Sequence, residues 1–62
     1  MTIYEKIKSL CDSKGISIRE CEKRAGIGNG TIAGWQTSSP VIAKLQAVAN
    51  VLDVSIGKLV ED

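Results

Sequence analysis

The stretch that decides the fold is GISIRECEKRAGIGNGTIAGW, residues 15–35. Ser17 is followed three residues later by Glu20, which is the pattern of a capping box and predicts the start of a helix. Ile16 before this cap and Cys21 after it have the spacing of a hydrophobic staple. The apolar face of this helix is formed by Ile18, Cys21 and Ala25, which have helical spacing. Gly26 is predicted to end the helix.

A second short helix is predicted directly afterwards, over about residues 29–36. Gly28 is its predicted N-cap, and Ile27 and Ile32 again have the spacing of a hydrophobic staple. Ile32 and Trp35 are the side chains that we expect to anchor this helix in the core. A helix, the short break GIGN and a further helix together have the spacing of a helix-turn-helix.

Helical periodicity continues on both sides of this stretch. A first helix is predicted over about residues 3–13, ending at Gly15. Its apolar positions are Ile3, Ile7, Leu10 and Cys11. After the break TSSP, Ser39 is the predicted N-cap of a longer helix with Pro40 at its first position, and Ser55 is predicted to cap a short last helix. The apolar positions of the longer helix are Val41, Leu45, Val48, Ala49 and Leu52.

These patterns together predict an all-α fold. We expect five short helices in a single domain that spans residues 1–62, with the helix-turn-helix at about residues 17–36. No internal repeat, low-complexity segment or linker divides the chain. A domain of this size buries only about 60% of its unfolded surface, so its stability depends on a well-patterned helical core.

The glycines of the turn allow two other interpretations. Residues 28–33, GNGTIA, match the G-x-G-x-x-A pattern of dinucleotide-binding folds, but that pattern functions between a strand and a helix of a large parallel sheet. A chain of 62 residues cannot supply such a sheet. Asn29-Gly30 is also a typical β-hairpin turn, although the following TIAGW is too short for a strand. The interpretation that we favour for these glycines is that the N-terminus of the helix that follows them faces the phosphates of a nucleic-acid duplex.

Composition narrows the classes of function. The chain has no histidine, and its two cysteines lie on apolar helical faces without a base nearby, which argues against an enzyme, a metal site, a cofactor or a small-molecule substrate. No leader-like or membrane-length apolar run is present, which favours a cytoplasmic protein with reduced thiols. A redox switch through Cys11 and Cys21 stays open as an alternative. The net charge is +1, with basic residues concentrated over residues 6–24.

Residues 17–59 resemble the lambda repressor-like helix-turn-helix domains of phage repressors and Cro proteins. The segments that carry the resemblance are GISIRECEKRAGIGNGTIAGW, SSP and LQAVANVLDVSIGKLV. It implies a sequence-specific DNA-binding transcriptional regulator, of the repressor type found in phages or other mobile elements. The helix at about residues 29–36 would enter the major groove of double-stranded DNA. A homodimer on a pseudo-palindromic operator is expected, because one such domain contacts few bases.

The resemblance also implies individual roles. Asn29 occupies the first base-reading position, where an amide can pair with adenine, and Thr31 lies near the DNA backbone or a thymine methyl. Ile18 stands where the family frequently has a phosphate-binding glutamine, so this contact is lost or passes to Arg19. The residues expected at the DNA are Ser17, Arg19, Gly28, Asn29, Gly30, Thr31, Gly34, Thr37 and Ser38.

Two further features depart from a simple repressor. Many members carry an arginine and a glutamate where this chain has Cys11 and Gln36, so both charges of that pair are missing together. The few polar side chains on the reading face also fit a second hypothesis, an antitoxin or anti-repressor-like module whose main partner is a protein. Candidates for a dimer surface are Ile56, Leu59 and Val60, although Leu59 is also expected to pack inward.

Overall fold

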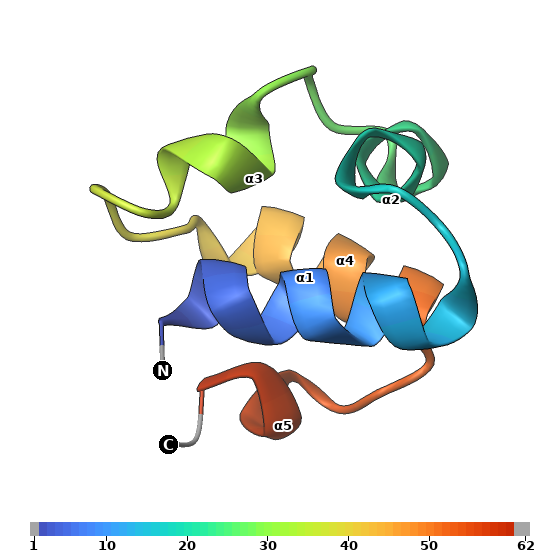
Figure 1. Ribbon diagram of the computed structural model, residues 1–62. Helices are drawn as coiled ribbons and strands as arrows, with labels where there is room; N and C mark the ends of the chain where they lie inside the picture. The colour runs from blue at the N-terminus through green and yellow to red at the C-terminus, as the bar shows by residue number, and fades with distance from the viewer. Residues whose placement is uncertain (1, 61–62) are drawn as a thin grey trace.

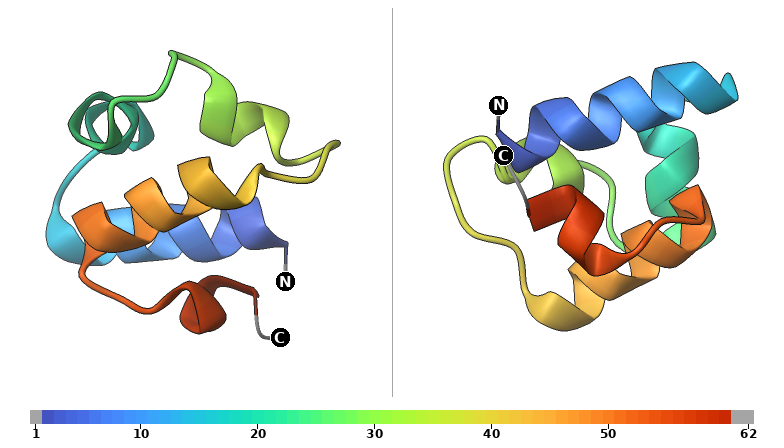
Figure 2. Two further views of the ribbon diagram at one scale, coloured as in Figure 1. Left: turned by 180° about the vertical axis from the view of Figure 1, so that it is seen from behind. Right: turned by 90° about the horizontal axis from the view of Figure 1, so that it is seen from below.

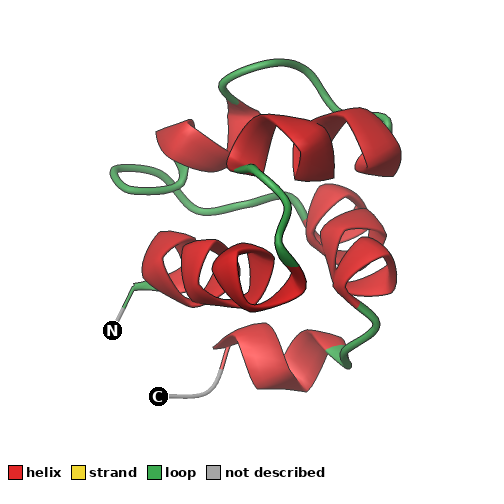
Figure 3. Ribbon diagram, turned by 45° about the vertical axis from the view of Figure 1, so that its right-hand side comes forward, coloured by secondary structure: helices red, strands yellow, loops and turns green. Residues whose placement is uncertain are grey.

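The computed structural model describes residues 2–60, which form five α-helices and no strand (Figures 1 and 3). The helices are α1 (Ile3–Lys14), α2 (Ile18–Ala25), α3 (Thr31–Gly34), α4 (Ile42–Leu52) and α5 (Ile56–Val60). Helices α1 and α4 lie in the middle of the domain, α2 and α3 cover one side, and α5 covers the other (Figures 1 and 2). The predicted all-α fold of five short helices is confirmed.

Helix α1 is bounded by hydrogen bonds at both ends. The Thr2 hydroxyl accepts the Glu5 N–H at 3.1 Å, and the Glu5 carboxylate accepts the Thr2 N–H at 3.2 Å, which makes a complete capping box. The bonds from Thr2 lower the pKa of Glu5. At the other end the N–H of Gly15 donates to the Asp12 carbonyl, so the glycine ends the helix as predicted. The capping box at Thr2 has no counterpart in the sequence-based prediction.

Helix α2 begins and ends where the sequence predicts, with half of the expected capping box. The Ser17 hydroxyl accepts the Glu20 N–H at 3.0 Å. The Glu20 carboxylate does not return this bond, because it lies 2.9 Å from the Arg24 side chain one turn along the helix. Gly26 ends the helix in a left-handed conformation. One side-chain acceptor is therefore sufficient to start this helix.

Helix α4 begins two residues after the predicted position. Val41 is its N-cap, and the first helical bond runs from the Leu45 N–H to the Val41 carbonyl at 2.9 Å. The predicted cap Ser39 and the predicted first residue Pro40 both lie in the loop before it. The physical reason is local: the chain after α3 continues in turns, in which the Ser38 N–H and hydroxyl both donate to the carbonyl of α3's last residue.

The core is formed by side chains from all five helices and the residue after α3. Its members are Ile7, Cys11, Cys21, Ile32, Trp35, Leu45, Val48, Ala49, Leu52 and Leu59. Most of these residues were predicted from helical periodicity. Val41 was also predicted to lie on the apolar face of the longer helix, but its side chain is 60% exposed because it precedes α4. Both cysteines are free and buried. Burial raises the pKa of Cys11, and it raises the pKa of Cys21 to about 12, where the neighbouring Cys11 thiol adds to the effect.

Candidate nucleic-acid interface

The predicted second helix of the helix-turn-helix is shorter than expected. Gly30, not Gly28, is its N-cap, with φ of 87°. An L-residue rarely adopts this backbone conformation, and an α-helix cannot contain it, so α3 begins at Thr31. After Gly34 the chain continues in tighter i→i+3 turns, beginning with the bond from the Trp35 N–H to the Ile32 carbonyl at 3.0 Å. The prediction of a helix over residues 29–36 is therefore wrong at both ends.

The start of α3 is capped from another helix. Glu22 of α2 is 3% exposed and is the one charged residue in the core of the described residues. One of its carboxylate oxygens accepts the Gly30 N–H at 3.1 Å, and the other accepts the Ile32 N–H at 2.9 Å. No side chain within α3 or its N-cap makes such a bond. Glu22 thus performs the function of an N-cap residue across the turn.

Sequence analysis did not identify Glu22 as part of this site. The sequence contained one weak signal, which is that Glu22 lies four residues after Ile18 and one after Cys21, at the edge of the apolar face of α2. A carboxylate at this edge is either at the protein surface or paired inside the core, and helical periodicity cannot distinguish the two cases. The partners of Glu22 are eight and ten residues away in the chain.

This arrangement corrects one expectation about phosphates. The first N–H groups of the helix were expected to be unpaired and to face the DNA backbone. Instead, the N–H groups of Gly30 and Ile32 donate to Glu22, and the Thr31 N–H donates to the Gly28 carbonyl at 3.2 Å. These three donors already have partners in the protein, so a phosphate contact there would require a bond to break.

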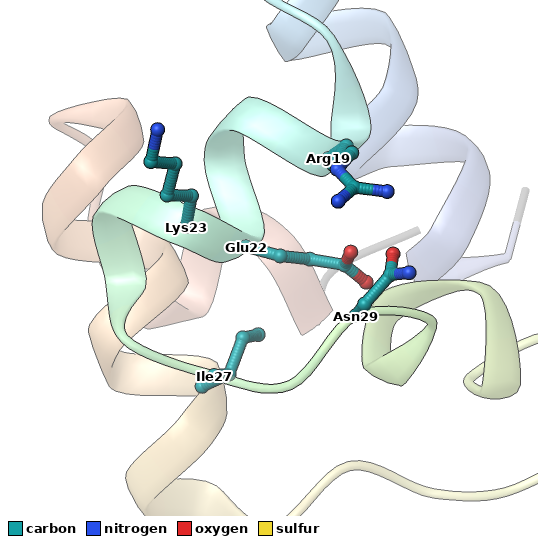
Figure 4. Close-up of a pocket in the computed structure, with 5 residues that line it drawn as sticks. All are labelled: Arg19, Glu22, Lys23, Ile27 and Asn29. Carbon is teal, nitrogen blue, oxygen red and sulfur yellow. The ribbon is translucent and has the colours of Figure 1, made fainter.

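Arg19 and Asn29 lie beside one another at the surface. Figure 4 shows both side chains close to the end of the Glu22 carboxylate, and together with Lys23 and Ile27 these residues line an open hollow of about 190 Å³. Arg19 and Lys23 have no carboxylate within 4.0 Å in the described part of the chain, where the ion pairs join Lys8 to Asp12 and Arg24 to Glu20. The rim of the hollow therefore carries two cations and an amide that are free to contact a ligand.

The hydroxyl groups predicted at the interface differ in what they can donate. Ser17 accepts a bond from the α2 backbone, which leaves its own proton available for an acceptor such as a phosphate oxygen. Thr37 and Ser38 each donate their proton to the Gly34 carbonyl, at 3.4 and 2.9 Å. A phosphate accepts hydrogen bonds and does not donate them, so Ser17 is better suited to bind one.

Among solved structures, the N-terminal DNA binding domain of SinR from Bacillus subtilis is similar to this chain. The two share 30% sequence identity with a TM-score of 0.88, and the similarity covers 97% of this chain and 91% of that one. The chain belongs to the lambda repressor-like helix-turn-helix family. Neither a protein-family model nor a curated protein matches the sequence.

The two side chains that were predicted to anchor the second helix of the motif, Ile32 and Trp35, are both buried. This agrees with the lambda repressor-like family. One candidate for the dimer surface of this lambda repressor-like domain is corrected: Leu59 is 1% exposed and belongs to the core, so it cannot also form a contact surface. Val60 is exposed, and Ile56 packs partly against the core.

None of the described helices has the length and hydropathy to cross a membrane.

Proposed function

We propose that this chain is a sequence-specific DNA-binding transcriptional regulator that presents α3 and the preceding turn to the major groove of double-stranded DNA. The observation that carries this proposal is the similarity to the SinR DNA binding domain over nearly the whole chain. The exposed amide of Asn29 supports it independently, because it lies at the edge of a hollow whose cations, Arg19 and Lys23, have no carboxylate partner among residues 2–60.

In this proposal, different groups provide position and specificity. Arg19 and the Ser17 hydroxyl contact phosphates, which places the domain on the duplex without selecting a sequence. Asn29 contacts a base edge, and an amide pairs best with adenine. The outward positions of α3, beginning with Thr31 and ending with Gly34, carry short side chains or none, so DNA shape contributes the rest of the specificity.

The finer features of the regulator are proposals of the same kind. A homodimer would place two copies of α3 about 34 Å apart on a pseudo-palindromic operator. Val60 is an exposed apolar side chain available for its interface, with Ile56 beside it at partial exposure. We infer a repressor of the type encoded by phages or mobile elements, acting in the cytoplasm.

The test is a selection from a random library of DNA duplexes at physiological salt, followed by sequencing of the bound pool. Enrichment of a site with two related halves supports a sequence-specific dimer and gives the half-site spacing directly. Enrichment of a single half-site supports the same function for a monomer. Binding without any enrichment, which disappears as salt rises, contradicts sequence-specific regulation.

A second candidate function is a protein-interaction module, of the antitoxin or anti-repressor kind. The observation that favours it is the exposure of two adjacent apolar side chains at the start of α4, with Val41 60% and Ile42 68% exposed. This candidate predicts weak DNA affinity that is independent of sequence. The selection described above therefore distinguishes the two functions.

A further inference from the structure

The buried carboxylate of Glu22 holds the part of the molecule that carries Asn29. Removing a carboxylate from water is costly unless strong hydrogen bonds compensate. Here both oxygens accept backbone N–H groups, at 2.9 and 3.1 Å, and such charge-assisted bonds are the stronger kind. In the described residues no buried side-chain nitrogen or oxygen lacks a partner. The carboxylate is therefore fully used in joining α2 to the start of α3.

The bond to Gly30 acts directly on Asn29. The N–H of Gly30 belongs to the peptide group that joins Asn29 to Gly30, and a peptide group is planar. Holding this N–H fixes the peptide plane that follows the Asn29 α-carbon, and the bond from the Thr31 N–H to the Gly28 carbonyl closes the turn on its other side; together they restrict the direction in which the side chain leaves the backbone. Asn29 lies between two glycines, whose backbone freedom would otherwise allow many directions.

We propose that Glu22 is the positioning residue of the DNA-reading edge: it directs the Asn29 side chain and sets where α3 begins. This inference rests on the proposed function, because it assigns to Asn29 a contact with DNA. Glu22 itself touches no base or phosphate, since both of its oxygens face backbone N–H groups inside the domain. It increases specific affinity by reducing the conformations that Asn29 must lose on binding.

A carboxylate suits this role better than an amide does. Two N–H donors converge on Glu22, and a carboxylate offers an acceptor to each of them. A glutamine of the same shape has one acceptor oxygen, and its NH₂ group would face the second donor. The substitution Glu22→Gln therefore keeps the volume of the side chain and removes one of the two bonds.

The first measurement uses the unmodified protein and follows the exchange of backbone amide protons with solvent by NMR. Gly30 and Asn29 are adjacent and both exposed, but only the Gly30 N–H has an acceptor in the described residues. We expect the Gly30 amide to exchange about tenfold more slowly than the Asn29 amide, or more slowly still. Equal exchange rates of the two amides would overturn the proposal. This measurement does not depend on the folding of any variant.

The second measurement compares Glu22→Gln with two controls, using the duplex enriched by the selection and a random duplex. Glu22→Gln is expected to lower affinity for the enriched duplex about tenfold, with affinity for the random duplex unchanged. Glu20→Gln removes the same charge from the same helix at a half-exposed position, where the carboxylate pairs with Arg24 and not with the turn, and should preserve the ratio of the two affinities. Val48→Ala destabilises the core on α4, and should also preserve this ratio at temperatures where the protein is folded.

The outcomes separate positioning from stability and from charge. A loss of discrimination confined to Glu22→Gln supports positioning, because neither general destabilisation nor a missing negative charge reproduces it. The same loss in Val48→Ala or in Glu20→Gln overturns the proposal. If no duplex is enriched, the proposed function fails, and faster exchange of Gly30 and Ile32 in Glu22→Gln still decides whether Glu22 positions this turn.

Discussion

Helices α4 and α3 are held in place by different interactions. Four residues of α4 are buried, and in the described residues no side-chain hydrogen bond joins this helix to another one, so apolar packing places α4 in the domain. Helix α3 has one buried residue within its bounds, Ile32, and two hydrogen bonds from Glu22. Apolar packing is strong but tolerates small rotations, whereas hydrogen bonds restrict direction. The comparison indicates that packing supplies stability to the domain, and directional bonds position the segment that is proposed to contact DNA.

The largest effect should come from a buried residue of α4. Leu52 is completely buried, so Leu52→Ala should lower the free energy of unfolding by about 2–5 kcal/mol, through lost burial and the cavity that remains. A domain of this size has a total stability of about 5 kcal/mol, so this variant should keep at most about 3 kcal/mol and unfold at a much lower urea concentration. Ile42→Ala changes an exposed apolar residue at the other end of the same helix, and should alter stability by less than about 0.5 kcal/mol. Urea denaturation followed by circular dichroism measures both, and similar losses would contradict the role given to packing.

The second effect concerns binding and leaves stability unchanged. Asn29→Ala should lower affinity for the selected duplex by about 1–3 kcal/mol and barely change affinity for a random duplex, because only a base contact is lost. Arg19→Ala is the control, and should weaken binding to both duplexes. It should also reduce, by about one, the magnitude of the slope of log affinity against log salt concentration. Fluorescence anisotropy at several salt concentrations measures these quantities. An equal loss on the two duplexes for Asn29→Ala would remove it from base recognition.

The third effect tests the geometry of the turn with two matched substitutions. A β-carbon at Gly30 or at Gly34 would meet no atom within 4 Å, so only backbone conformation distinguishes them. Gly30→Ala should destabilise the domain by about 1–2 kcal/mol, because alanine disfavours the left-handed conformation. Gly34→Ala lies in a helix and should stabilise it by up to about 1 kcal/mol. Thermal unfolding of both variants gives the sign of each change in stability. Changes of the same sign would contradict the conformation assigned to Gly30.

The smallest effect is a pH dependence that originates in the core. The folded protein holds the Cys21 proton with a pKa of about 12, against 9.0 for a free thiol. Below pH 9 both states are protonated, so the stability is fully present there. Above pH 9 the unfolded state loses this proton first, and stability should fall by at most about 1.4 kcal/mol per pH unit. Denaturation of wild type and Cys21→Ala between pH 7 and 10 isolates this thiol, and parallel curves would contradict the assignment.

The sequence by itself determined which segments are helical and which faces are buried. Ser17, Gly15 and Gly26 bound helices by bonds that span five residues or fewer, so their effect is visible in a short window of sequence. The periodicity of apolar residues placed the core for the same reason, because spacing along a helix fixes which side chains share a face. The likeness to the lambda repressor-like family followed from these local patterns together.

Only the tertiary structure decided where α3 begins and how Asn29 is held. The start of α3 depends on Glu22, whose partners lie eight and ten residues further along the chain on the far side of a turn. The start of α4 differs in this respect, because the bonds of the Ser38 N–H and hydroxyl to the end of α3 are local. Each polar group has several possible partners in the sequence, and packing of the helices selects one of them by bringing it within hydrogen-bond distance.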